Sequence, residues 1–208
     1  MTVSQGIGAA MVNLAEAQRL LQLEPSVDPD FFGEWQGVLP AVSDLDREFC
    51  DRLRRRYFYY ADRGAITEST VSLILVAPLL DYLGWCDPPY QVRGERLVRL
   101  AVEDGAQTLQ GLIDVLVVQG DLWVVLLESK RYGFSVRQAL PQTLAYLMGN
   151  PTNTVSYGLI TTGEDFLFVK VDRSRNLYDV SDKLTLSLRR NNALERVMQI
   201  LRHLVPLN

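Results

Sequence analysis

The hydrophobic residues of this 208-residue chain change their spacing near Gln91. Before that point they recur every three or four residues, which is typical of amphipathic helices. After it they alternate with polar residues or run almost unbroken, which is typical of strands. The expected helices cover about residues 43–62, 68–83, 136–149 and 191–204, and the expected strands about 98–102, 109–118, 122–130, 155–162 and 166–172. This order predicts an α/β fold with a central mixed β-sheet flanked by helices.

Capping and breaking residues help to locate the helix ends. Ser43 followed by Asp46 is typical of a helix N-terminus, and Thr67 is a suitable N-cap for the second helix. Proline lacks an N–H group, so we expect Pro78 to bend that second helix and Pro141 to interrupt the third.

Residues 1–40 differ from the rest of the chain. They hold a short amphipathic stretch, about 10–23, followed by a connector rich in proline and aspartate at 24–29. We interpret residues 1–40 as an N-terminal accessory segment, a helical extension of one larger domain over residues 41–208. A chain of this length can bury one large core.

The rare residue types limit the metal chemistry. His203 is the single histidine, and Cys50 and Cys86 are isolated, so the chain cannot build a zinc, haem or iron–sulfur site. A bound metal would be held by oxygen atoms, as Mg²⁺, Mn²⁺ and Ca²⁺ prefer. Since only three of the 21 basic residues are lysines, a lysine inside a motif is informative.

Hydropathy, cysteine content and charge indicate the cellular compartment of the protein and its contact with membranes or nucleic acid. Apolar runs stay well short of the roughly 20 residues that a membrane span needs. Two distant cysteines, with no signal-peptide pattern before them, indicate a reducing compartment. We therefore expect a cytoplasmic protein without membrane contact. The net charge of −4 argues against a nonspecific nucleic-acid coat, although not against a local basic surface.

The densest positive cluster lies in the first expected helix. It comprises Arg52, Arg54, Arg55 and Arg56, followed at once by Tyr57, Phe58, Tyr59 and Tyr60. One interpretation is a surface that binds phosphates and stacks bases. The sequence favours the other, a solvated helix face, because Glu48–Arg52 and Asp51–Arg55 have the favourable i,i+4 order for ion pairs.

Charged residues interrupt two of the apolar strands. Asp114 lies within the second strand, and Glu128 and Lys130 share a face at the end of the third. Burying a charge is costly unless it is paired or binds a cation. Two carboxylates converging there, together with the Ser129 carbonyl, suit a hard divalent cation. Lys130 would then orient a water molecule for phosphodiester hydrolysis.

Such a shared site requires a particular register between the two strands. With a two-residue loop at 120–121, Asp114 would pair with Leu127 and lie on the face opposite Glu128. A three-residue loop or a β-bulge would put both carboxylates on one face. We therefore predict an odd-numbered loop or a bulge at this turn.

Asp114, followed after thirteen residues by Glu128-Ser129-Lys130, resembles the signature of the PD-(D/E)XK nuclease superfamily. The surroundings are similar to the N-terminal nuclease domain of type I restriction enzyme R subunits, and the resemblance covers about residues 65–172. Gly111-Leu112-Ile113-Asp114 resembles the first acidic motif, Gln142 to Tyr146 the Q-x-x-x-Y motif, and Glu68 the family's helical glutamate. Ile113 stands where the signature has proline.

The resemblance implies a restriction-endonuclease-like core and Mg²⁺, with Mn²⁺ as a substitute. Asp114 and Glu128 would be metal ligands, Glu68 an auxiliary ligand directly or through water, and Lys130 the catalytic lysine. Gln142 and Tyr146 would lie on one helix face beside the site, where Gln142 would hold Lys130 or a DNA phosphate.

Three functions remain open at this point. The first is a Mg²⁺-dependent DNA endonuclease. The second is a noncatalytic DNA-binding or assembly protein with the same fold, and the third is a dimeric nuclease similar to junction resolvases. No G-x-x-x-x-G-K-[ST] loop is present, so in restriction the motor and specificity subunits would be other chains.

Overall fold

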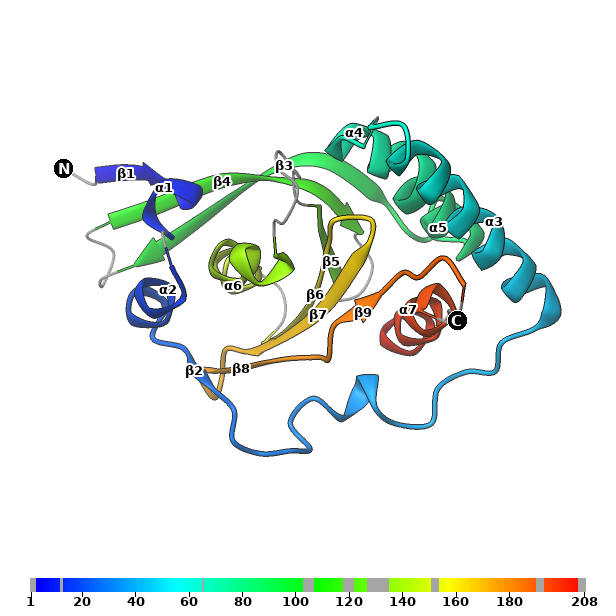
Figure 1. Ribbon diagram of the computed structural model, residues 1–208. Helices are drawn as coiled ribbons and strands as arrows, with labels where there is room; N and C mark the ends of the chain where they lie inside the picture. The colour runs from blue at the N-terminus through cyan, green and yellow to red at the C-terminus, as the bar shows by residue number, and fades with distance from the viewer. Residues whose placement is uncertain are drawn as a thin grey trace.

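The computed structural model describes residues 3–11, 13–64, 66–102, 107–117, 122–126, 135–150, 154–189 and 193–205. It confirms an α/β fold in which helices flank a mixed arrangement of strands (Figure 1). Among the helices in these ranges, none has both the length and the apolar character needed to cross a membrane.

The strands form two hydrogen-bonded groups that meet where β4 and β5 lie side by side (Figure 1). The order β1-β4-β3 makes the first group and β2-β8-β7-β6-β5 the second, with β9 also paired to β7. β1 is parallel to β4, β5 to β6 and β2 to β8, and the other pairs are antiparallel. The bounds are β1 Val3–Gly6, β2 Glu24–Pro25, β3 Val92–Val102, β4 Gln107–Val117, β5 Leu122–Leu126, β6 Val155–Thr161, β7 Asp165–Asp172, β8 Leu177–Val180 and β9 Leu184–Thr185.

The helices cover the two faces of these strands and enclose two cores. One core lies under α1, α2 and α6, and the other under α3, α5 and α7. Their bounds are α1 Ile7–Ala10, α2 Leu14–Leu21, α3 Asp44–Ala61, α4 Glu68–Val71, α5 Ala77–Tyr82, α6 Leu140–Met148 and α7 Ala193–Leu204, with 3₁₀ turns at Gly33–Trp35 and Val136–Ala139 and a π-turn at Ser72–Val76.

Neighbouring residues of β6 and β7 point into different cores. Leu159 packs beneath α3 and α7, whereas Ile160 packs beneath α6. Phe166 and Leu167 divide in the same way, and all four side chains are buried. Both faces of these strands are therefore covered, which explains why their sequences are apolar without alternation.

The helix starts at Ser43 and Thr67 are confirmed. The Ser43 hydroxyl accepts a hydrogen bond from the Asp46 N–H, and the Asp46 carboxylate accepts one from the Ser43 N–H, forming a capping box for α3. Thr67 caps α4 by accepting from the Thr70 N–H.

Pro78 is accommodated by a π-turn directly before it. Because proline has no N–H, the carbonyl of Ile74 loses its usual helical partner. Arg56 of α3 donates to that carbonyl, with 3.2 Å between Nη1 and O. The expected disturbance at Pro78 therefore takes the form of the wider turn Ser72–Val76.

Pro141 does not interrupt a helix, which corrects the expectation from sequence. A 3₁₀ turn, Val136–Ala139, leads into α6, and Pro141 lies in the first turn of α6. In that position a backbone N–H has no partner within the helix, so proline costs little.

The N-terminal segment contributes to the sheet at two places. β1 lies beside β4, and β2 pairs with β8. The amphipathic stretch predicted at about 10–23 contains α2, which packs against α6. Residues 1–40 are thus joined to the larger domain by backbone hydrogen bonds and by helix packing.

Candidate functional site

Glu68 is the first residue of α4, at the end of the helical layer where α3 and α4 meet. A turn at residues 62–64 follows α3, and α4 begins at Glu68. The Glu68 carboxylate lies in the first turn of α4, where the backbone N–H groups favour negative charge. Glu68 is half-buried and has an interaction partner.

Asp114 lies within β4, close to the end that leads into β5. Its neighbours Ile113 and Val115 are paired with Arg96 and Gly94 of β3. The backbone register is therefore described on both sides of Asp114, whereas the Asp114 side chain is outside the described part of the structure.

Glu128, Ser129 and Lys130 follow β5 after Leu126 and lie outside the described residues. The turn over residues 118–121 lies outside them too, so the expected odd-numbered loop or bulge stays a prediction. What the structure does establish is that β4 and β5, the strands that carry the two halves of the motif, are neighbours.

Gln142 and Tyr146 are joined on one face of α6, as the i,i+4 spacing predicts. The Gln142 amide donates to the Tyr146 hydroxyl, with 2.6 Å between Nε2 and Oη. Tyr146 is only 2% exposed, and its ring lies against β4 at Gly111. A Cβ at Gly111 would lie 3.0 Å from the Tyr146 hydroxyl oxygen, so the motif's glycine makes room for this tyrosine.

The expected metal site can be judged only in part. Among the described residues, three or more His, Cys, Asp or Glu side chains do not gather closely enough to hold a metal ion. Of the expected ligands, only the Glu68 side chain belongs to the described part of the structure. The side chains of Asp114 and Glu128 and the Ser129 carbonyl lie outside it. The expected donors are carboxylate and carbonyl oxygens, a set that fits Mg²⁺ or Mn²⁺ by its chemistry.

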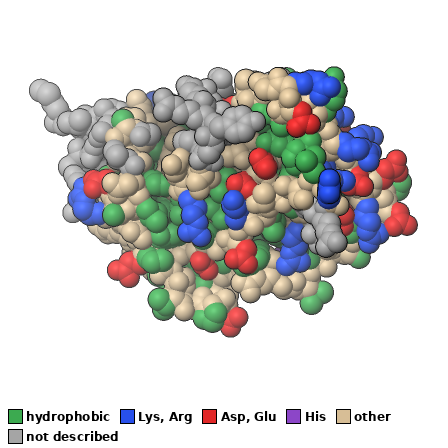
Figure 2. All heavy atoms as spheres, viewed as in Figure 1, with side chains coloured by type: hydrophobic (Ala, Val, Ile, Leu, Met, Phe, Trp, Pro, Cys, Tyr) green, Lys and Arg blue, Asp and Glu red, His purple; other side chains and the backbone are tan. Residues whose placement is uncertain are grey.

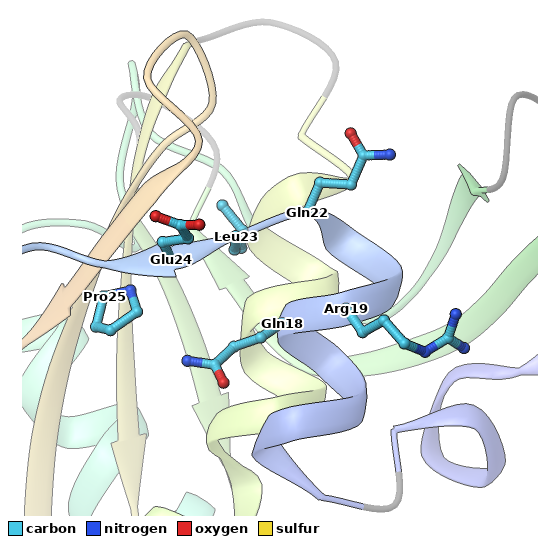
Figure 3. Close-up of a pocket in the computed structure, with 6 residues that line it drawn as sticks. All are labelled: Gln18, Arg19, Gln22, Leu23, Glu24 and Pro25. Carbon is cyan, nitrogen blue, oxygen red and sulfur yellow. The ribbon is translucent and has the colours of Figure 1, made fainter.

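A surface hollow of about 420 Å³ lies at the C-terminal end of α2 and the start of β2. Its lining residues are Gln18, Arg19, Gln22, Leu23, Glu24 and Pro25. Figure 3 shows that their polar side chains point away from one another. Arg19 is already paired with Glu16, with 2.8 Å between Nη2 and Oε1. The hollow therefore lacks the convergent polar groups of a specific binding site.

Sequence reasoning missed an enclosed ion pair around Lys170 of β7. The Lys170 ammonium lies 2.5 Å from Glu34 Oε1 and 2.6 Å from the Phe31 carbonyl oxygen. Tyr157 also donates to Glu34, at 2.7 Å. Burial raises the pKa of Glu34, but the bonds from Lys170 and Tyr157 outweigh it and leave that pKa below its ordinary value. The available signal was a rare lysine inside an apolar strand.

A second ion pair, in which the carboxylate is buried, joins α3 to α7. Arg202 donates to both carboxylate oxygens of Asp46, at 2.8 and 3.0 Å, and Tyr82 of α5 donates to Oδ1 at 2.9 Å. Arg202 and the capping contacts of Ser43 hold the pKa of Asp46 far below its usual range. We call Asp46, Arg202, Tyr82 and Ser43 the Asp46 cluster. All its contacts are internal, so its role is structural.

Protein-family models and curated proteins give no match to this chain.

Proposed function

We propose that this protein is a Mg²⁺-dependent DNA endonuclease or nuclease module that hydrolyses phosphodiester bonds, similar to the nuclease domain of type I restriction R subunits. One observation carries the proposal: β4, with Asp114, lies beside β5, which ends at Leu126, two positions before Glu128 in the sequence. The order of the elements also suits the restriction-endonuclease-like core. Helices α3 to α5 precede β3, β4 and β5, then α6 crosses over to β6, which is parallel to β5.

The register of β4 supports a common face for the two carboxylates. β4 pairs with β3 without a change of register from Gln107 to Val117. Gly111 faces Tyr146 of α6, and position 114 is three residues further along the strand. Because strand residues alternate between faces, position 114 falls in the phase directed away from α6.

The register of β5 leads to the same face. β5 pairs in parallel with β6, so that positions 122 and 124 align with Tyr157 and Leu159. Those two side chains belong to the core beneath α3 and α7. We propose that residues 127 and 128, which lie outside the described residues, extend β5 in the same phase, so that position 128 would also be directed away from α6. Glu68 belongs to the helices on that side as well, so three carboxylates would share one face of the sheet.

This phase gives Gln142 and Tyr146 a supporting role. They belong to α6, which covers the opposite face from position 114. We propose that they are positioning residues, which fix β4 at Gly111 and thereby the strand that carries Asp114. Their effect on the reaction would be exerted through β4 rather than by contact with DNA.

Asp114 and Glu128, the Ser129 carbonyl and Glu68 would hold the cation by their oxygen atoms. A bound Mg²⁺ would supply the positive charge that polarises the phosphate oxygens. The Lys130 ammonium would orient the attacking water and stabilise negative charge developing on the phosphate. Carboxylates offset by a cation would also lower the repulsion that DNA meets from a chain of net charge −4.

A plasmid-nicking assay with Mg²⁺ or Mn²⁺ tests the proposal. We expect the wild type to nick DNA and Lys130→Ala to lose at least 100-fold in rate, consistent with a positioned proton-transfer group. Lys183→Ala is the matched control, because Lys183 is an exposed lysine paired with Asp165 at 3.0 Å. Equal cleavage by wild type and Lys130→Ala would reject the catalytic assignment.

Mn²⁺ binding, followed by calorimetry, separates the metal from the chemistry. Asp114→Asn and Glu128→Gln should weaken binding, whereas Lys130→Ala should preserve it. Metal binding without cleavage would move support to a noncatalytic DNA-binding or assembly protein. Cleavage that depends on a dimer in sedimentation experiments would favour the resolvase-like alternative. Recovery of activity only with added motor or specificity subunits would define the protein as a restriction module.

A further inference from the structure

Along one face of α3 and in the turn that follows it lies a row of basic and aromatic side chains. The row, which we call the basic stripe, comprises the exposed residues Arg52, Arg55, Tyr59 and Arg63 and the half-buried Arg56, which donates to the Ile74 carbonyl oxygen. The spacing of three and four residues aligns them along one face of the helix, and the buried residues Phe49, Leu53 and Tyr57 line the adjoining face. Figure 2 shows Lys and Arg side chains, interspersed with acidic ones, along the side of the molecule where Figure 1 places α3.

The arginines of the basic stripe lack carboxylate partners. Within the described part of the chain, none of the four lies within 4.0 Å of an Asp or Glu oxygen. The i,i+4 pairs expected from the sequence do not form there, since Asp51 instead binds Arg54 at 2.8 Å. Acidic Glu48 and Asp62 flank the stripe without pairing to it. The positive charge of Arg52, Arg55 and Arg63 is thus left open to solvent.

Arg54 explains why the expected pair of Asp51 with Arg55 is absent. Its guanidinium is fixed by the carbonyl oxygens of Leu188 at 2.6 Å and Ser187 at 3.3 Å, which come from a distant part of the chain. In this position the Arg54 guanidinium donates to the Asp51 carboxylate, so Arg55 has no bond to Asp51 and remains exposed to solvent. The guanidinium of Arg52 lies 5.3 Å from the centre of the Phe49 ring.

Tyr59 supplies an aromatic surface within this positive field. It is 54% exposed although it lies on a folded helix. The Arg63 guanidinium stacks 3.7 Å from the centre of its ring, and Arg63 also donates to the Tyr59 carbonyl oxygen at 2.8 Å. Tyr60 supports the ring from the side, at 5.4 Å between centroids. The ring is therefore held in a fixed orientation while much of it remains accessible.

We propose that the basic stripe binds single-stranded DNA, with phosphates on Arg52 and Arg55 and a base stacked on Tyr59. An exposed ring among cations suits unpaired bases, because the bases of a duplex hide their faces from the protein. The stripe covers about 14 Å of helix from residue 52 to the end of α3 at Ala61, at about 1.5 Å per residue, and Arg63 lies in the turn beyond it. It ends at the turn before Glu68, so the proposal rests on the nuclease function and deepens it.

Fluorescence anisotropy with a labelled 15-nucleotide oligo-dT, without divalent cations, tests the stripe alone. We expect Arg52→Gln/Arg55→Gln to weaken binding at least tenfold and to lower the salt slope by about 0.7 per lost phosphate contact. Tyr59→Ala should cost about tenfold, and Tyr59→Trp should retain binding. Arg19→Gln on α2 is the matched control, an exposed helical arginine away from the stripe, and should bind as the wild type does. Thermal melts would verify the fold of each variant.

Several results would overturn the inference. The first is that the double arginine variant binds oligo-dT as tightly as the wild type does. The second is that the wild type binds a 15-base-pair duplex as tightly as oligo-dT or more tightly. The third is that it prefers phosphatidylserine vesicles to the oligonucleotide. The nicking assay separates this inference from the proposed function. If the wild type nicks DNA but the stripe variants bind oligo-dT normally, the stripe proposal alone fails. If the variants lose binding but the wild type never nicks, the nuclease proposal alone fails.

Discussion

The charged residues on the two sides of α3 differ in their partners: those on one side are bound within the protein, and those on the other are exposed to solvent. On the inner side, Asp46 is 4% exposed and every contact in the Asp46 cluster is made within the protein. On the outer side, Arg52 and Arg55 of the basic stripe are exposed and have no carboxylate partner among the described residues. The difference suggests a rule for this fold: charges that are saturated internally maintain the structure, and charges left open are available to a ligand.

The largest expected effect lies in the Asp46 cluster. Asp46→Asn removes the charge that Arg202 binds and weakens the capping box, so we expect a loss of about 3 kcal/mol in the free energy of unfolding. Urea unfolding measures it. Asp44→Asn is the control on the same helical turn, because the Asp44 carboxylate is exposed and pairs only with Arg47 on its own helix. Similar losses in both variants would remove the distinction between the two sides.

The pH dependence of that loss sharpens the comparison. The pKa of Asp46 is lower in the folded state than the ordinary value of about 3.9. Its contribution to stability is therefore fully present above about pH 4 and lost as the pH falls further. The difference in free energy of unfolding between wild type and Asp46→Asn should be constant from about pH 8 to 5. Below pH 4 it should shrink, by at most about 1.4 kcal/mol per pH unit. A gap that closes near neutral pH would exclude Asp46 as its source.

Lys170 provides an intermediate case, because its partner Glu34 is only partly buried. Lys170→Met leaves the Glu34 carboxylate without its cation and the Phe31 carbonyl without a donor, so we expect a loss of about 2 kcal/mol. Lys183→Met, which breaks the more exposed pair with Asp165, should cost at most about 1 kcal/mol. Chemical denaturation compares the two, and a larger loss for Lys183→Met would contradict the rule.

The sequence predicted the elements that carry their own local signals. α3 was predictable because Ser43 and Asp46 form a capping box and the apolar residues recur with a helical period. β6 and β7 match the strands expected at 155–162 and 166–172, because their apolar runs are characteristic of strands buried on both faces. Asp114, Glu128 and Lys130 stood out as charges in apolar strands, although their arrangement remains a prediction.

What depends on distant residues was not predictable. β2 has two residues and includes Pro25, and it exists because it pairs with β8, about 150 residues away in sequence. Lys170 meets Glu34 across 136 residues, and Arg54 meets the Leu188 carbonyl across 134. The Arg54–Leu188 contact also changes the partner of Asp51, which pairs with Arg54, whereas local spacing predicted Arg55. Local rules therefore located the helix bearing the basic stripe but assigned its charges to the wrong partners.

The smallest expected effect on stability comes from the basic stripe itself. Arg55→Gln removes an exposed charge without a carboxylate partner among the described residues, so the free energy of unfolding should change by less than about 0.5 kcal/mol. The same variant should weaken oligo-dT binding several-fold, because one phosphate contact is lost. Asp46→Asn should show the reverse pattern, a large loss of stability with DNA affinity retained under conditions where it is folded. Measuring both quantities on both variants tests the separation of the two sides of α3, and a shared loss of stability and binding in either variant would contradict it.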